Sequence, residues 1–230
     1  MSQTVRSGVA APKRHSKRPW ILWLLCVLAG VFYWLIFHSQ YFIATTVKVQ
    51  GNKRVATEQI SSAATVALNQ PLIKLPSQDI SKVISGIAEV KSVSVERGWP
   101  HTVLITVTER KPIAVANDGT QLVLVDDAGI AASGAIPEVP KGMLVVTGAP
   151  STTAMHAAVT VIAGLPKDWK VTGVDAPTQD SVTVHLDGGV NITFGSGVDI
   201  DQKVKVAAAL MANKYTAINV SSPDAPTVTK

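Results

Sequence analysis

The 230-residue sequence predicts an α+β protein with a membrane anchor helix, a β-α-α-β-β domain and a second, β-rich domain with two helices. Three observations predict this architecture. Residues 20–37 carry no charge, short segments of alternating apolar and polar residues recur after them, and a few segments have helical apolar spacing. The predicted parts are a cytoplasmic tail at 1–18, a transmembrane helix at 19–38, domains at 44–115 and 116–222, and a C-terminal tail at 223–230.

The uncharged run has the length of a membrane-spanning helix. At 1.5 Å per residue it forms a helix of about 27 Å, close to the roughly 30 Å of a bilayer's hydrocarbon core. A cleaved signal peptide has a shorter, aromatic-poor core and a small-residue cleavage site, which the segment after His38 lacks. A retained single-pass anchor is therefore predicted. Aromatic residues suited to the two membrane interfaces are Trp20, Trp23, Tyr33, Trp34, Phe37 and Tyr41.

The charge distribution predicts the orientation of this anchor. The chain carries 21 Lys/Arg and 16 Asp/Glu, and five of the cations precede the uncharged run without any acid, so the net charge of +5 lies in the tail. A basic tail can bind nucleic acid, but cations next to a membrane span are more typical of an orientation signal. The tail is predicted to be disordered and cytoplasmic, with the rest of the chain after residue 38 outside the cytoplasm. Its cations are Arg6, Lys13, Arg14, Lys17 and Arg18.

The sequence offers little chemistry for catalysis or metal binding. The single cysteine, Cys26, lies in the predicted anchor, so the outer domains depend on apolar cores rather than disulfides. The five histidines lack the spacing of metal ligands, and no Gly-x-Ser-x-Gly motif is present. Asp126 and Asp127 precede Ala-Gly and fit a turn better than a catalytic pair. No catalytic residue, metal ligand or cofactor site is predicted.

The first domain is predicted to be a strand, two helices and two further strands. Thr57 and Ser77 are expected to cap the two helices through their hydroxyl groups. A hairpin loop at 98–101 joins the last two strands, and the helices cover one face of a three-stranded sheet. The predicted strands are 46–50, 91–97 and 102–109. The apolar stripes of the helices are Ile60, Ala63, Ala64, Ala67 and Leu68, then Ile80, Val83, Ile84 and Ile87.

The second domain is predicted to contain several short strands and two helices. Asp199 is expected to cap the later helix, with Gln202 completing a capping box. The turn at 187–189 predicts a β-hairpin between the two strands that flank it. The predicted strands are 121–125, one starting at Ile130, 143–146, 182–186, 190–194 and 216–221. The helical stripes are Ala154, Ala157, Ala158, Val161 and Ile162, then Val204, Ala208, Met211 and Tyr215.

Several phrases of this sequence carry a resemblance to a known family. They are Val47-x-Val49-x-Gly51-Asn52, Val95-x-Arg97-x-Trp99-Pro100, Glu109-Arg110-x-Pro112, Val125-Asp126-x-x-Gly129 and Phe194-Gly195 followed by Lys203. On these residues the chain resembles the FtsQ/DivIB bacterial cell-division proteins, in which the first extracytoplasmic domain is a POTRA domain. The resemblance covers roughly residues 20 to 228. The residues of the POTRA signature are Arg97, Trp99, Pro100, Glu109 and Pro112.

The resemblance implies a function without catalysis. Members of this family are scaffolds of the division complex that connect early division proteins with septal peptidoglycan-synthesis proteins. The implied partners are membrane proteins of the FtsB/DivIC and FtsL types, with no cofactor, nucleic acid or small-molecule substrate. The implied location is the cell membrane at the division septum. The alternative is a membrane-anchored cell-wall enzyme or chaperone that uses the small domain as a positioning arm.

The last predicted strand is the candidate partner-binding segment. Pro223 and Pro226 follow it, and because proline cannot donate a ladder hydrogen bond they favour an edge strand. A frayed terminus fits the sequence equally well. The resemblance favours the edge, because in the FtsQ/DivIB family the strand after the last helix accepts a strand from a small coiled-coil division protein. The predicted partner-binding residues are Thr216, Ala217, Ile218, Asn219, Val220 and Ser221.

Two substitutions follow from these predictions. Trp99 lies in the hairpin loop of the first domain, where it either packs on the core or presents a contact. A structural role is expected, and Trp99→Ala then costs about 3 kcal/mol if the ring is buried. In the last strand, Asn219→Pro or truncation after Tyr215 is expected to abolish partner binding, because proline removes a donor and obstructs the ladder.

Overall fold

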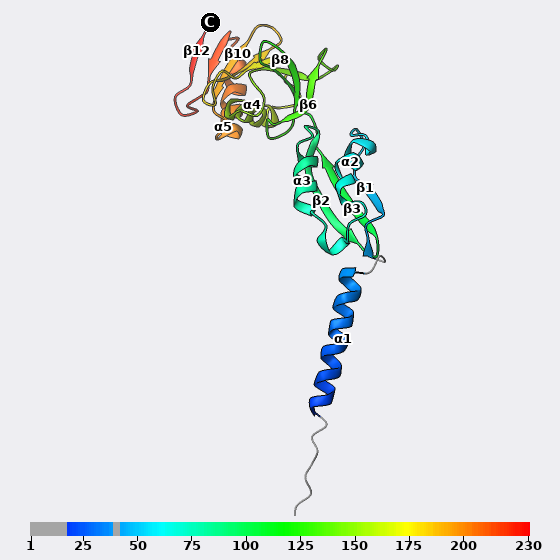
Figure 1. Cartoon of the computed structure of the whole chain (residues 1–230). Helices are drawn as coiled ribbons and strands as arrows, with labels where there is room; N and C mark the ends of the chain where they lie inside the picture. Colours follow the sequence, from blue (N-terminus) through cyan, green and yellow to red (C-terminus); the bar gives the residue numbers. More distant parts are fainter. Residues whose placement is uncertain (1–17, 39–41) are drawn as a thin grey trace, which may run out of the picture.

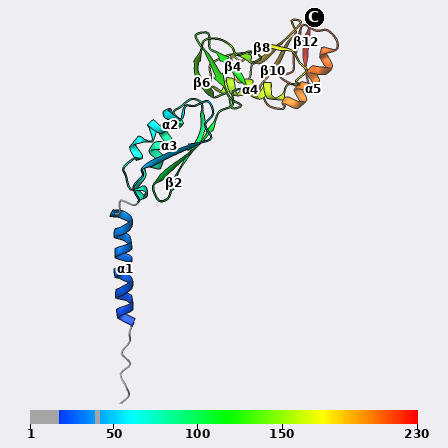
Figure 2. The same cartoon turned by 90° about the vertical axis from the view of Figure 1, so that its right-hand side faces the viewer.

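The computed structural model describes residues 18–38 and 42–230. The predicted basic tail, apart from Arg18, and the interfacial Tyr41 lie outside these residues. Helix α1 (Arg18–His38) stands apart from two folded domains that follow it in chain order (Figures 1 and 2). Its apolar side chains between residues 20 and 35 are exposed.

Among the described residues, no helix has the combined length and hydropathy of a membrane span.

The first domain confirms the predicted β-α-α-β-β order. Its strands are β1 (Thr46–Gln50), β2 (Val90–Gly98) and β3 (Thr102–Glu109), and its helical segments are α2 (Thr57–Ala63), η2 (Thr65–Ala67), η3 (Leu72–Lys74) and α3 (Ser77–Ser85). The sheet order is β1-β3-β2, with β3 parallel to β1 and antiparallel to β2. Val103, Ile105 and Val107 are buried, because alternate residues of β3 face the helices.

Neither predicted hydroxyl cap is present in this domain. Thr57 and Ser77 are the first helical residues, and the N-cap positions belong to Ala56 and Pro76, which make no side-chain cap. Thr57 Oγ1 instead accepts a hydrogen bond from Asn52 Nδ2 at 2.9 Å. The prediction placed both caps one residue too late, because a hydroxyl inside the first turn no longer occupies the capping position.

The helical stripes of the first domain are partly different from those predicted. Helix α2 ends at Ala63, and the buried Ala67 belongs to the separate 3₁₀ turn η2. In α3 the side chains of Ile80 and Ile84 are buried, whereas Val83 is 61% exposed. The i, i+4 pair therefore faces the sheet, and Val83 lies off the buried face.

The second domain is built on one nine-stranded sheet with the order β12-β11-β10-β9-β8-β7-β4-β5-β6. Strands β4, β7 and β8 run parallel, β10 and β11 are also parallel, and the remaining neighbours are antiparallel. The strands are β4 (Ala114–Asn117), β5 (Leu122–Val125), β6 (Ala131–Ile136), β7 (Leu144–Thr147), β8 (Val171–Asp175), β9 (Val182–Leu186), β10 (Asn191–Gly195), β11 (Ala217–Asn219) and β12 (Thr227–Thr229).

Two helices cover this sheet. Helices α4 (Thr153–Gly164) and α5 (Ile200–Met211) contact each other; α4 also contacts β9, and α5 contacts β10 and β11 (Figure 1). Phe194 and Met155 are among the largest side chains buried between the layers. The helix N-cap of α4 is Thr152, whose hydroxyl accepts a hydrogen bond from Met155 N at 3.1 Å.

The predicted cap of α5 and one residue of its predicted apolar stripe are wrong. Asp199 occupies the N-cap with a left-handed φ of 53° but makes no side-chain cap, so no capping box forms. On the helix, Ala208 is exposed, whereas Ala207 and Lys203 are buried. Of the predicted stripe only Ala208 lies off the buried side, because Val204, Met211 and Tyr215 are partly buried and pack against the core.

Lys203 is an unusual member of this buried face because it is only 3% exposed. Its ammonium group donates a hydrogen bond to Ser196 O at 2.9 Å. Burial lowers the pKa of Lys203, and the carboxylates of Asp199 and Asp180 partly offset this effect. The hydrocarbon part of the side chain thus packs in the core, and the bonded ammonium group ties α5 to the end of β10.

Candidate partner-binding surface

The outer strand at the C-terminal end of the large sheet is β12, not β11. Strand β11 pairs with β10 in parallel on one side and with β12 in antiparallel on the other. The prediction that residues 216–221 form the outer edge is therefore wrong. The chain turns back after this segment, with Ala225 N donating to Ser222 O at 3.1 Å, and residues 227–229 then pair along β11. Pro223 and Pro226 lie in this turn, and strand pairing resumes after them.

The hydrogen bonds of β11 determine which backbone groups of β12 face outward. On either side of β11, Asn191 N donates to Thr216 O at 2.9 Å and Val220 N donates to Thr193 O at 2.8 Å, so by alternation the groups of Ile218 between them also face β10. By strand alternation, Ala217 and Asn219 turn their N–H and C=O groups to β12. Their register partners are Thr229 and Thr227. The N–H and C=O of the residue between them therefore point away from the sheet.

That residue is Val228, the centre of the edge strand. Its side chain is 39% exposed, and the two threonines beside it are exposed as well. The neighbouring strand β11 is fixed in the core, because the side chain of Ile218 and that of Val220 just after it are buried. Strand β12 is therefore a short, exposed edge next to a buried strand, and another extended segment can pair with such an edge.

The remaining predicted binding residues lie under or beside this edge. Asn219 and Ser221 are exposed, and Asn219 Oδ1 accepts a hydrogen bond from Ser221 N at 2.9 Å. Thr216 N donates to Thr229 O at 3.0 Å and helps to dock the edge strand. These residues therefore position β12, and partner binding by residues 216–221 remains a prediction.

The POTRA signature residues Arg97 and Glu109 hold the first domain together. Arg97 Nε donates to Leu72 O at 2.6 Å and joins the edge strand β2 to the turn η3. The carboxylate of Glu109 accepts hydrogen bonds from the N–H groups of Lys53, Arg54 and Val55 at 2.7–3.1 Å. Burial favours the neutral acid, but these bonds outweigh it and hold the pKa of Glu109 below its usual value.

Trp99 and Pro100 occupy the predicted hairpin loop. The indole of Trp99 is 52% exposed and packs edge-on against the ring of Phe42, with 5.4 Å between the ring centroids and 79° between the planes. The ring of Trp99 is therefore not buried, so the loss of about 3 kcal/mol expected for a buried ring does not apply. The aromatic contact ties the loop to the segment that enters β1.

For this reason Trp99→Ala is expected to lower the free energy of unfolding by only about 1 kcal/mol, the value of a partly exposed aromatic pair. Urea unfolding of the full chain in mild detergent, followed by circular dichroism, measures the change. The control is Val83→Ala, which removes an exposed apolar side chain without a ring contact and is expected to change stability by about 0.5 kcal/mol or less. A loss of about 3 kcal/mol at Trp99 would contradict the half-exposed position.

The two domains meet at a buried ion pair. Arg110 Nη1 lies 2.7 Å from Asp126 Oδ2, and the Asp126 side chain is 0% exposed. The carboxylate also accepts hydrogen bonds from the N–H groups of Ala128 and Ile130, both at 3.0 Å. Burial favours the neutral acid, but the bond from Arg110 and the two backbone bonds outweigh it, so the pKa of Asp126 is lowered.

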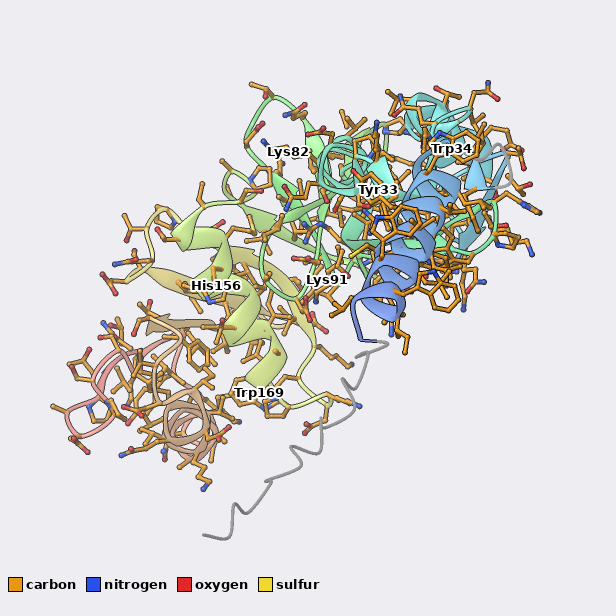
Figure 3. The ribbon with its side chains drawn as sticks, turned by 60° about the horizontal axis from the view of Figure 1, so that its bottom comes forward. Tyr33, Trp34, Lys82, Lys91, His156 and Trp169 are labelled. Carbon is orange, nitrogen blue, oxygen red and sulfur yellow. The ribbon has the colours of Figure 1, made fainter. Side chains whose placement is uncertain are left out.

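Further contacts surround this junction. Lys91 Nζ on β2 lies 3.0 Å from Asp127 Oδ1, and both side chains are largely exposed. The turn at 126–129 packs against the start of α4, where a Cβ on Gly129 would lie 2.8 Å from His156 N. Gly129 has a φ of 72°, so both its backbone conformation and its surroundings require glycine. Figure 3 labels Lys91 on the first domain and His156 on α4.

A second polar cluster lies on the face of β8, β9 and β10. His185 Nδ1 lies 2.7 Å from Asn191 Oδ1, and His185 Nε2 lies 2.8 Å from Asp175 Oδ2. The bonds to Asn191 and then to Asp175 raise the pKa of His185. Within residues 18–38 and 42–230, no group of three or more His, Cys, Asp and Glu side chains is placed to hold a metal ion.

Comparisons with known proteins agree with this architecture. Residues 42–110 match the model of the FtsQ-type POTRA domain, and residues 114–224 match that of the C-terminal domain of cell division protein FtsQ/DivIB. The chain is 32% identical to cell division protein FtsQ of Streptomyces venezuelae, covering 88% of this chain and 79% of the relative. It is 30% identical to FtsQ of Mycolicibacterium smegmatis, covering 90% and 64%.

A solved structure of the major extracytoplasmic domain of DivIB from Geobacillus stearothermophilus is also similar, at 19% identity and a TM-score of 0.35 over 46% of this chain and 93% of that one. The first family model ends at Arg110, which pairs with Asp126, and the second begins at Ala114. Together with the Streptomyces venezuelae relative, these matches extend over both folded domains. The chain belongs to the FtsQ/DivIB family of bacterial cell-division proteins.

Proposed function

We propose that this protein is a non-enzymatic scaffold of the divisome that binds membrane proteins of the FtsB/DivIC and FtsL types. In this role it connects early division proteins with septal peptidoglycan-synthesis proteins. The observation that carries the proposal is the exposed edge strand β12, whose central residue turns its N–H and C=O away from the sheet. A partner strand gains main-chain hydrogen bonds at such an edge without any catalytic chemistry.

The partner strand is proposed to add outside β12 rather than to replace it. All three residues of β12 are in register with β11, and Thr216 N adds a bond to Thr229 O at 3.0 Å. Replacement would first break these bonds, whereas addition uses groups that face solvent. Specificity would come from the exposed side chains of the strand, among which Val228 offers an apolar contact.

Residues 19–38 are proposed to anchor the protein in the cell membrane at the septum. The uncharged run at 20–37 and the exposed apolar side chains of α1 support this proposal, because such a surface is unfavourable in water. Five cations before the run support a cytoplasmic N-terminus and two domains outside the cytoplasm.

A topology experiment tests this arrangement. Alkaline phosphatase fused after Lys230 is expected to be active, because that enzyme matures only outside the cytoplasm. Replacing the five tail cations with glutamate is expected to reduce this activity by impairing orientation. The control replaces five exposed lysines of the second domain with glutamate, which leaves the tail unchanged and is expected to preserve the orientation. An inactive phosphatase fusion together with an active cytoplasmic reporter at the same site would refute the scaffold model.

A further inference from the structure

A basic groove lies beside the junction of the two domains, on the side of the β1–α2 loop. We call it the junction groove; its volume is about 470 Å³, and it is lined by Gly51, Lys53, Arg54 and residues 107–112. Four of the lining residues have cationic side chains, and Glu109 is the only lining residue with a carboxylate. The groove is thus formed by two chain segments that are distant in sequence and both carry positive charge.

Two of the cations are already engaged within the protein. Arg54 Nε lies 3.6 Å from Glu109 Oε2, and its Nη2 donates to the carbonyl oxygen of Arg110. Arg110 itself is paired with the buried carboxylate of Asp126. These bonds fix the walls of the groove and neutralise their charges.

The other two cations, Lys53 and Lys111, are exposed. Within the described residues, no ion pair of the structure involves either lysine. Glu109 cannot neutralise them, because its oxygens accept three backbone N–H groups and face Arg54. The groove therefore keeps an excess of about two positive charges, supplied from both of its sides.

Apolar groups accompany these charges. Pro112 is half-buried in the lining, and Val107 lines the groove as well. Bare phosphate or another small anion would leave this apolar surface unused. A peptide with carboxylates on either side of an apolar side chain would match both features.

The groove is also far from the proposed membrane surface. Strand β3 begins where His101 O accepts hydrogen bonds from Thr45 N and Thr46 N, close to the connection with α1, and it ends at the groove with Glu109. Its 8 residues span about 26 Å at 3.3 Å per residue. The Debye length at physiological salt is only about 8 Å, so anionic lipid headgroups would be screened at that distance. This step rests on the proposed anchor.

We propose that the junction groove binds an acidic peptide segment of another extracytoplasmic protein, with carboxylates that contact Lys53 and Lys111 and an apolar residue that contacts Pro112. This site is separate from the β12 edge. The protein would then hold two partners at once, one along the edge strand and one at the domain junction.

The probe is a fluorescent peptide of sequence GDEIDEG, compared by anisotropy with the uncharged peptide GNQINQG on the full chain in detergent. The acidic peptide is expected to bind about tenfold more tightly. Lys53→Gln/Lys111→Gln is expected to weaken its binding about tenfold, since two partly exposed ion pairs are lost. The matched control, Lys74→Gln/Lys82→Gln, removes the same charge from exposed positions elsewhere in the first domain and is expected to change binding less than about twofold.

Equal binding of the two peptides, or an equal loss in both double variants, would overturn the proposal. Vesicles of phosphatidylglycerol form a second arm. If the groove variant loses binding to these vesicles while wild type does not bind GDEIDEG, the groove recognises lipid instead and the proposal is wrong.

The affinity of the FtsB/DivIC-type partner is measured on the same variants, and an unchanged affinity separates this site from the strand-addition site. A failure of that partner to bind wild type would refute the proposed function without affecting the peptide result.

Discussion

Replacing Asp126 with alanine is expected to lower the free energy of unfolding by about 3 kcal/mol, because the charge of Arg110 is left largely buried without its partner. The pair is 2.7 Å long, and the Asp126 side chain is fully buried. The substitution also leaves the N–H groups of Ala128 and Ile130 without their acceptor. Urea unfolding of the full chain in detergent, followed by circular dichroism, measures the loss.

The neighbouring residue supplies a matched control. Asp127 also pairs with a cation across the junction, but its side chain is 67% exposed and that of Lys91 is 46% exposed. Asp127→Ala is therefore expected to cost less than about 1 kcal/mol. Equal losses for the two substitutions would show that burial of the Arg110–Asp126 pair does not determine its contribution.

The same pair predicts a dependence of stability on pH. The pKa of Asp126 is lowered from its usual 3.8, so the folded state favours the ionised carboxylate. The resulting stabilisation is present above pH 3.8 and is lost as the pH falls through the lower pKa of the folded state. Asp126→Asn is expected to remove this part of the acid dependence. A wild-type and an Asp126→Asn protein with parallel stability curves below pH 3.8 would contradict the assignment.

The second large effect is expected for partner binding. Val228→Pro is expected to weaken binding of an FtsB/DivIC-type partner by at least about 100-fold, because it removes the outward N–H and places a ring in the path of the added strand. Proline is tolerated at an edge position whose N–H faces solvent, and the preceding Thr227 is already extended. The fold should therefore persist. Isothermal titration with the partner's extracytoplasmic segment measures the affinity, and circular dichroism monitors the fold.

Thr227→Pro distinguishes addition from replacement. Its N–H faces Asn219, so proline there undocks β12 from β11 while the edge of β11 becomes free. If the partner adds outside β12, this substitution also weakens binding; if the partner replaces β12, binding becomes tighter. Asn219→Pro is a less selective probe, because Asn219 pairs with Thr227 of β12 and its Oδ1 accepts a hydrogen bond from Ser221 N.

The order of strands and helices in the first domain could be predicted from the sequence, although its helix caps could not, and neither could the order of the large sheet. Strand β3 alternates apolar and polar residues over its whole length, which is the pattern of a sheet with one covered face. Strand β4 was missed because Ala114, Val115 and Ala116 are all buried and show no alternation. Strand β8 was missed because Gly173 and Asp175 interrupt it and only Val174 is buried.

The candidate site was predicted one strand too far inward. The prolines at 223 and 226 favour an end to the strand pairing, but they lie in the turn that returns the chain to β11. The signal that could have revealed β12 is the segment Thr227-Val228-Thr229, three β-branched residues directly after a proline. The buried Asp126 had no such signal, because an aspartate in a turn and an aspartate in an ion pair look alike in sequence.

Amide hydrogen exchange at Val228 tests the strand-addition proposal most directly. In the free protein its N–H is expected to exchange rapidly, while the N–H of Asn219, which faces β12, is protected. Binding of the FtsB/DivIC-type partner is expected to protect Val228 and to leave Asn219 protected. If Val228 exchanges at the same rate with the partner bound at saturation, no strand is added at this edge and the account is wrong.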